Sequence, residues 1–131
     1  MTPQEFEDNV RELRRRQRRF FRCRKDDPDR EKALQLMREA EKPLRQVLDA
    51  NRRFCHPGKP KSKREEFFIV VDDMMRKQEQ WMKQGGGSGF MYAAHEAEKM
   101  VDKWLTKYEE DKAAEKRHAI EEIQKQQPTL F

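Results

Sequence analysis

The sequence of 131 residues is poor in apolar residues, cysteine and glycine. Hydrophobic residues make up 34% of the chain and aromatic residues 9%, while 42% of the residues are charged. No apolar stretch approaches the roughly 18 residues that a membrane span requires, and the first residues lack the charged-then-apolar order of a signal peptide. Two cysteines, Cys23 and Cys55, are too few for a disulfide framework. The sequence therefore predicts one cytoplasmic domain without membrane contact.

Groups that could catalyse a reaction or bind a metal are also scarce. The three histidines and two cysteines show no CxxC or HxxxH spacing, and zinc sites rarely form from scattered ligands. The glycines of residues 85–89 follow no predicted strand and precede no Gly-Lys-Ser/Thr ending, so they do not indicate a phosphate-binding loop. No combination of nucleophile, base and orienting group can be assembled from these residues. We therefore expect a binding protein without cofactor, metal or enzymatic activity.

Apolar residues recur at helical spacing along almost the whole chain, and no alternating run is long enough to predict a sheet. The pattern predicts an all-α four-helix bundle. Helices should begin at Thr2-Pro3 and at Ser62, where a capping hydroxyl is followed three residues later by glutamate. The last helix, from Ser88 to Gln124, would be about 55 Å long, against about 33 Å for the first. Its C-terminal third should therefore overhang the bundle.

An internal repeat relates the two halves of the chain. At an offset of 61, the apolar stripe of residues 6–20 falls on residues 67–81, and at an offset of 57, residues 39–48 fall on 96–105. These matches predict two copies of a helical hairpin, residues 2–54 and 62–125, with a connector at 55–61 and a flexible peptide at 126–131. A hairpin cannot bury its apolar face alone, so the copies should pack together. Chance similarity between amphipathic helices is the alternative.

The repeat places Gln17 and Gln78 at matching centres of two apolar stripes. A buried amide must find hydrogen-bond partners. We therefore predict that the two side chains bond to each other across a pseudo-twofold axis and fix the register of their helices.

The second hairpin carries a loose pattern that consists of Val71, Met75-Arg76, Gln78 and Trp81, then Ala94, Glu98, Val101-Asp102 and Leu105. This pattern resembles a short helical-hairpin family found in phages and mobile elements of Bacteroidota-type bacteria. The first copy departs from it, with Leu13-Arg14 at the Met-Arg position, one residue out of step, and Leu44-Arg45 at the Val-Asp position. The resemblance implies a helical hairpin and no particular activity.

The basic residues concentrate in the N-terminal half, and most of all between Arg11 and Lys25. That stretch holds nine basic residues and one acidic residue, Glu12. At 100° per residue, five arginines point away from the buried stripe and should form one face: Arg11, Arg15, Arg18, Arg19 and Arg22. The arginine fork matches phosphate oxygens, which predicts salt-sensitive, sequence-independent binding of DNA or RNA.

Other partners would also suit this face. The arginines could pair with Asp29, Glu31 and Glu39 of the next helix or bind an acidic protein. In that case the chain would be a protein-interaction or structural module, such as an inhibitor of a host protein or a homo-oligomer joined through its methionine-rich stripes.

The last five residues, Gln127-Pro128-Thr129-Leu130-Phe131, place two large apolar side chains beyond a polar helix. They resemble the pentapeptide by which bacterial replication and repair proteins dock on the sliding clamp, although Pro128 stands where that family has leucine. The resemblance implies that Gln127, Leu130 and Phe131 bind a partner. The alternative is that Leu130 and Phe131 fold back onto the bundle. The combined hypothesis is a phage or mobile-element accessory factor that contacts nucleic acid or the replication machinery.

Overall fold

The computed structural model describes residues 1–51, 60, 62–84 and 88–126. Every regular element in these ranges is a helix: α1 (Pro3–Arg22), α2 (Arg30–Asn51), α3 (Lys63–Lys83) and α4 (Ser88–Gln126). The predicted all-α four-helix architecture is confirmed. The predicted connector at 55–61 lies outside the described residues except for Pro60, and so do residues 85–87 of the glycine-rich turn.

Two helices begin where their capping residues predicted. The Thr2 hydroxyl accepts a hydrogen bond from the Glu5 backbone N–H at 3.1 Å, and the Ser62 hydroxyl accepts one from the Glu65 N–H at 3.2 Å. Each cap satisfies a backbone donor that has no partner within its own helix. The local sequence therefore sets the first turn of both α1 and α3.

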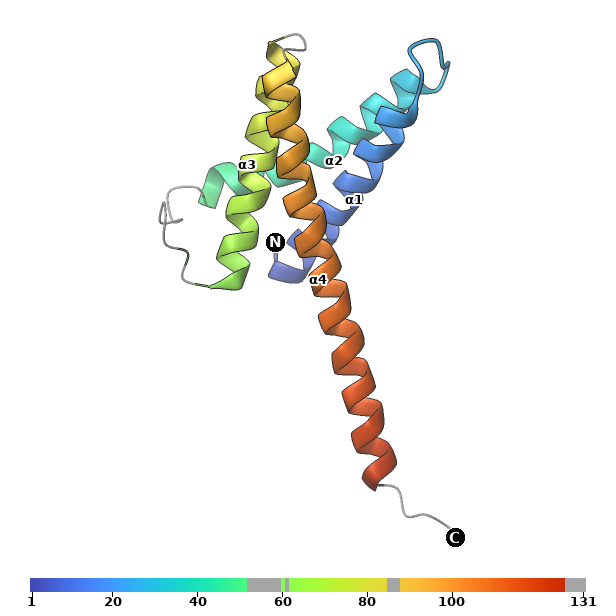
Figure 1. Ribbon diagram of the computed structural model, residues 1–131, viewed down its shortest axis with the longest axis vertical. Coiled ribbons are helices and arrows are strands. Elements are labelled where there is room, and N and C mark those ends of the chain that lie inside the picture. Colours follow the sequence, from blue (N-terminus) through green and yellow to red (C-terminus); the bar gives the residue numbers. More distant parts are fainter. Residues whose placement is uncertain (52–59, 61, 85–87, 127–131) are drawn as a thin grey trace.

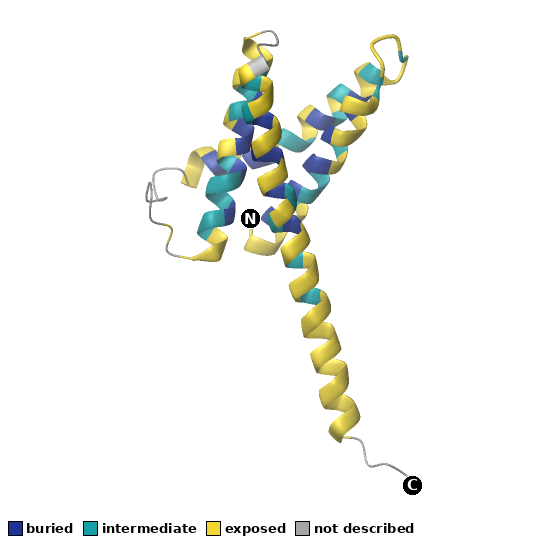
Figure 2. Ribbon diagram, viewed as in Figure 1, coloured by how far each residue is buried: buried dark blue, intermediate teal, exposed yellow. Residues whose placement is uncertain are grey.

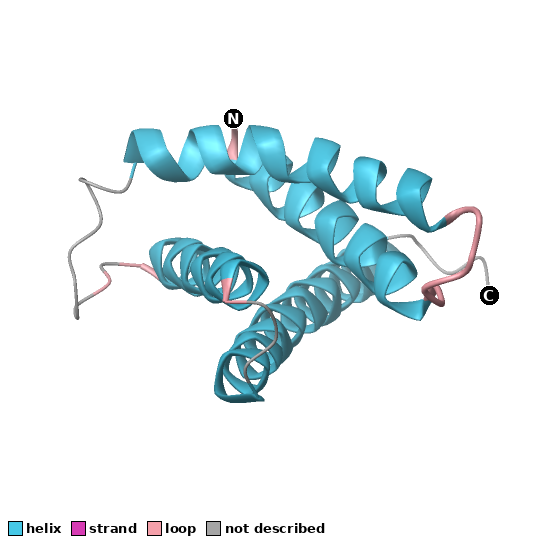
Figure 3. Cartoon of the chain, turned by 90° about the horizontal axis from the view of Figure 1, so that it is seen from above, coloured by secondary structure: helices cyan, strands magenta, loops and turns pink. Residues whose placement is uncertain are grey.

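The four helices form two hairpins, α1 with α2 and α3 with α4, which are set at an angle to each other (Figure 1). Seen from above, α1 lies between α2 and α4 (Figure 3). Its buried stripe faces the other hairpin. For example, the Phe6 ring of α1 meets the Phe67 ring of α3 edge to face, with 5.7 Å between the ring centroids. As a result, α1 has neighbours on two flanks and one side left open.

Several positions related by the offset of 61 are buried in both α1 and α3. Val10 and Val71 are both fully buried, and so are Leu13 and Met74. The predicted glutamine pair is also confirmed: each amide of Gln17 and Gln78 donates to the other's carbonyl oxygen, at 2.9 and 3.0 Å. Two reciprocal bonds satisfy groups that would otherwise be costly to bury.

One expectation about the core was wrong. The helical spacing of apolar residues also predicts that Phe21, at the end of the first stripe, is buried, but Phe21 is 44% exposed. Its position around the helix, about 40° from Gln17, lies within the stripe, but Phe21 stands in the last turn of α1, at the end of the core, where the Trp81 ring of α3 covers it in part.

The last helix projects from the bundle, as its length predicted (Figure 2). Lys112 still reaches Glu7 of α1 at 2.6 Å, whereas residues 113–126 are all exposed. These 14 residues extend about 21 Å at 1.5 Å per residue. None of the described helices combines the length and the hydropathy that crossing a membrane requires.

Candidate nucleic-acid interface

Four of the five predicted arginines lie exposed on one face of α1. They are Arg15, Arg18, Arg19 and Arg22, whose spacing of three, four and seven residues places them on adjacent turns. With Arg16, and with Ala33 and Leu36 of α2, these four line a pocket of about 350 Å³. We call the four exposed arginines the arginine face. It borders a hollow between two helices and is not a flat surface.

Acidic residues neutralise only part of this positive charge. Glu12 accepts hydrogen bonds from Arg15 at 2.6 and 3.0 Å and from Arg16 at 2.9 Å. The bonds from Arg15, and secondarily those from Arg16, lower the pKa of Glu12 to about 2. Glu12 is therefore ionised at every physiological pH and offsets one arginine charge. Arg18 lies 3.5 Å from Asp102 of α4.

The remaining two arginines are available to a ligand. Arg19 and Arg22 are exposed, and no ion pair joins either of them to another described residue. The pairing with Asp29, which precedes α2, and with Glu31 and Glu39 of α2 was the alternative considered above. It does not occur within the described part of the chain. The charge excess on this face is thus left for an anionic partner.

Arg11 does not belong to the arginine face, contrary to the prediction. Its side chain is 30% exposed, and its guanidinium lies 3.2 Å from Glu7 and 3.0 Å from Glu109 of α4. Helical arithmetic placed Arg11 on the outside of α1, but the long α4 passes along that flank. The arginine therefore joins two helices and is not offered to solvent.

Beneath the arginine face lies a buried network that the sequence analysis missed. Arg14, which is only 5% exposed, binds both carboxylate oxygens of Asp102 at 2.8 and 3.0 Å. It also donates to the Gln17 amide oxygen at 2.6 Å and to Glu98 at 3.3 Å. The second carboxylate oxygen of Glu98 lies 3.1 Å from His95.

A signal for Arg14 was present in the sequence. It stands three residues before Gln17, which puts it about 60° from the centre of the buried stripe. Moreover, the repeat aligns it with Met75, a core residue. An arginine at a core position predicts a buried partner.

A second buried carboxylate joins three helices near the start of α1. Glu7 is fully buried and receives Arg11 at 3.2 Å, Arg64 of α3 at 3.2 Å and Lys112 of α4 at 2.6 Å. Burial acts to raise the pKa of Glu7, but the contacts with Lys112 and Arg11 together lower it. Glu7 is a structural ion-pair centre that ties the two hairpins together.

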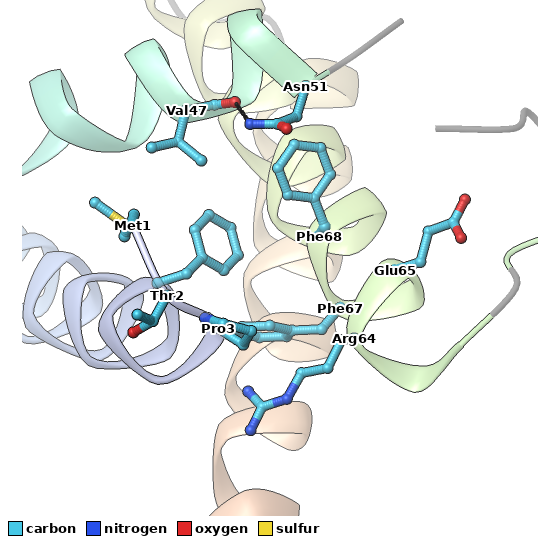
Figure 4. Close-up of a pocket in the computed structure, with 10 residues that line it drawn as sticks. Met1, Thr2, Pro3, Val47, Asn51, Arg64, Glu65, Phe67 and Phe68 are labelled. Atoms are coloured by element: carbon cyan, nitrogen blue, oxygen red, sulfur yellow. Dashed lines mark hydrogen bonds between the residues drawn. The ribbon is translucent and has the colours of Figure 1, made fainter. Parts of the chain in front are cut away.

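A separate apolar pocket of about 350 Å³ opens between the start of α1, the end of α2 and the start of α3 (Figure 4). Phe67 and Phe68 line it together with Met1 and Val47. Its arginine, Arg64, is already engaged by Glu7 and by the Tyr108 ring, which lies 4.4 Å from the guanidinium carbon. The pocket therefore offers no available cation for an anionic ligand.

One predicted site, the C-terminal peptide, remains without a structural description. Gln127, Leu130 and Phe131 lie outside the described residues. Within the described residues, no three histidine, cysteine, aspartate or glutamate side chains are grouped so that they could hold a metal ion.

Comparison of the chain with protein-family models, with curated proteins and with solved structures finds no match. Function must therefore be argued from the geometry of the arginine face itself.

Proposed function

We propose that the protein binds nucleic acid without sequence preference, through phosphate contacts made by Arg15, Arg18, Arg19 and Arg22. The observation that carries this proposal is the pair of exposed, unpaired guanidinium groups, Arg19 and Arg22, beside a hollow lined with arginine. Planar guanidinium groups bind phosphate oxygens in a bidentate manner. The Arg14 network supports the face from below by fixing α1 against α4.

The salt dependence of binding gives the expected magnitude. If four arginines each neutralise one phosphate, the logarithm of the binding constant should fall with the logarithm of salt concentration with a slope of about −3 to −4. Affinity should then drop about 100-fold between 50 and 200 mM salt.

The test is fluorescence anisotropy with labelled mixed-sequence DNA and RNA of equal length. Replacing Arg19 and Arg22 by glutamine removes two phosphate contacts and should reduce the salt slope by about 2. The matched control replaces Lys116 and Arg117, an exposed basic pair on the overhang of α4, in the same way. Equal affinities for the two double variants, or no binding by the unmodified chain at 50 mM salt, would contradict the proposal.

An acidic protein is the alternative partner for the same arginines. Competition with poly-glutamate of matched charge distinguishes the two classes. A nucleic-acid site that uses bidentate phosphate contacts should release little oligonucleotide to poly-glutamate, whereas a site for an acidic protein should be displaced readily.

We further propose a second interaction, docking on a sliding clamp through Gln127, Leu130 and Phe131. The overhang of α4 favours it, because residue 126 ends about 21 Å beyond the last side chain that contacts the bundle. Truncation after Thr129 should abolish capture of the chain by immobilised clamp. Capture that persists after this truncation would exclude the tail as the docking element.

A further inference from the structure

Next to the arginine face, aromatic side chains form a row that crosses from α1 to α3 and α4. The Phe21 ring is stacked on the Trp81 ring, with 5.8 Å between centroids and 25° between planes. Trp81 in turn meets His95 of α4 at 5.3 Å and 67°. The Phe21 side chain remains 44% exposed although it belongs to this row.

The row and the arginines are neighbours on the same helix. Phe21 follows Arg18 by three residues, so these two side chains are neighbours on the surface of α1. Arg22 is the next residue along the chain, and its side chain points about 100° away around the helix. The arginine-lined pocket lies on the α2 side of these arginines, and the aromatic row lies on the side of α3 and α4. A ligand whose backbone runs along the arginines can therefore place groups that project from one side of that backbone against the Phe21 ring.

Such a ligand needs an anionic backbone and flat apolar groups that can leave their own stack. A single-stranded nucleic acid has both, because every unpaired base presents a π face. A duplex keeps its bases stacked inside, and its major groove admits an α-helix only if that helix projects from its protein. The helix α1 is flanked by α2 and α4 (Figure 3). The pocket beside its arginines is lined by residues of both α1 and α2.

We infer that the arginine face is specific for single-stranded DNA or RNA, with Phe21 and Trp81 as the platform on which a base stacks. This inference rests on the proposed nucleic-acid binding and adds the class of nucleic acid. Arg18 and Arg22 hold the phosphates on either side of the stacked base. The stacked base then becomes a further aromatic partner for the exposed part of the Phe21 side chain.

The test compares single-stranded and duplex oligonucleotides of equal length with the full chain at 50 mM salt. In a Trp104→Phe background, Trp81 is the sole tryptophan, and its fluorescence should be quenched by oligothymidylate in a saturable manner. Phe21→Leu keeps an apolar side chain but removes the ring, and it should weaken single-strand binding roughly tenfold. Phe21→Tyr keeps the ring and should retain the affinity. Neither change should alter the salt slope, because Phe21 touches no phosphate.

The outcomes separate the inference from the function on which it rests. Duplex binding as tight as single-strand binding, or equal affinities for Phe21→Leu and Phe21→Tyr, overturns the platform. In either of these cases, the proposed nucleic-acid function stands if replacing Arg19 and Arg22 still weakens binding of the oligonucleotides. Absence of binding to either form overturns both.

Discussion

At positions related by the sequence repeat, Arg18 of α1 lies 3.5 Å from Asp102 of α4, whereas Glu79 of α3 lies 3.2 Å from Arg45 of α2. Residue 18 corresponds to residue 79, and residue 45 corresponds to residue 102. The two hairpins thus meet through equivalent ion pairs of opposite polarity. Their apolar residues show no such difference, since Leu44 and its equivalent Val101 are both fully buried.

The inverted polarity favours the pairing of one hairpin of each kind. Apolar burial is non-directional and would serve any combination of the two. Two copies of the first hairpin would place Arg18 against Arg45, and two copies of the second would place Glu79 against Asp102. Like charges at these positions disfavour both homodimers, so the charges specify that one hairpin of each kind packs together.

The buried positions around these pairs differ as well. Arg14 in the first hairpin corresponds to Met75 in the second, and Glu98 corresponds to Glu41. Glu98 is paired with Arg14 at 3.3 Å, whereas the ion pair of Glu41 among the described residues is a longer one, with Arg45 at 3.5 Å. Burial raises the pKa of Glu41, and Arg45 opposes this effect only in part. One carboxylate is thus well compensated, and its equivalent is not.

The largest loss of stability should follow from Arg14→Met, which gives the first hairpin the residue that the second hairpin has at the equivalent position. Arg14→Met leaves Glu98 buried without its cation, and loss of one partner of a buried pair costs about 3–5 kcal/mol. Urea unfolding measures the change in the free energy of unfolding. The control is Arg76→Met, which breaks the more exposed pair with Asp72 and should cost less than about 1 kcal/mol. Equal losses for the two variants would show that the Arg14 network does not hold the hairpins.

Neutralising the two equivalent carboxylates should have opposite effects. Glu98→Gln removes a charge that Arg14 compensates and should destabilise the fold by about 1–3 kcal/mol at pH 7. Glu41→Gln removes a poorly compensated, half-buried charge and should stabilise the fold by less than about 1 kcal/mol.

The pH dependence of the second variant provides a further check. The folded-state pKa of Glu41 lies above the ordinary value of 4.5, so its ionised form penalises the folded state above that raised pKa. The penalty vanishes as the pH falls through the raised pKa to the unfolded value. The gain from Glu41→Gln should therefore be present at pH 7 and absent near pH 4. A gain that is unchanged at the lower pH would exclude ionisation as its cause.

The smallest effect concerns the inverted pair itself. Glu79→Arg places two cations together where the hairpins meet, as a homodimer of the first hairpin would. Asp73→Arg makes the same charge change at a residue that pairs with Lys77 on its own helix. Glu79→Arg should be the less stable variant by about 0.5–1 kcal/mol at low salt. The difference should disappear near 0.5 M salt, where charges are screened within about 4 Å. If it persists in high salt, the contact with Arg45 is not electrostatic in origin.

Much of the fold was predictable because its determinants are local. The hydroxyl caps at Thr2 and Ser62 mark helix starts through bonds within one turn. The Gln17 and Gln78 pair followed from the repeat, which aligns two polar residues inside two apolar stripes. The partners of Arg14 were not predictable, because Glu98 and Asp102 lie 84 and 88 residues away along the chain.

The arginine run of α1 separates what the sequence determined from what the tertiary structure decided. Spacing along one helix determined that Arg15, Arg18, Arg19 and Arg22 share a face, since helical periodicity depends only on the chain itself. Only the packing of α4 across α1 decided that Arg11, at the start of the same run, faces Glu109. The angle at which the two hairpins cross depends on side chains from both hairpins. The apolar pattern of one helix therefore does not predict that angle.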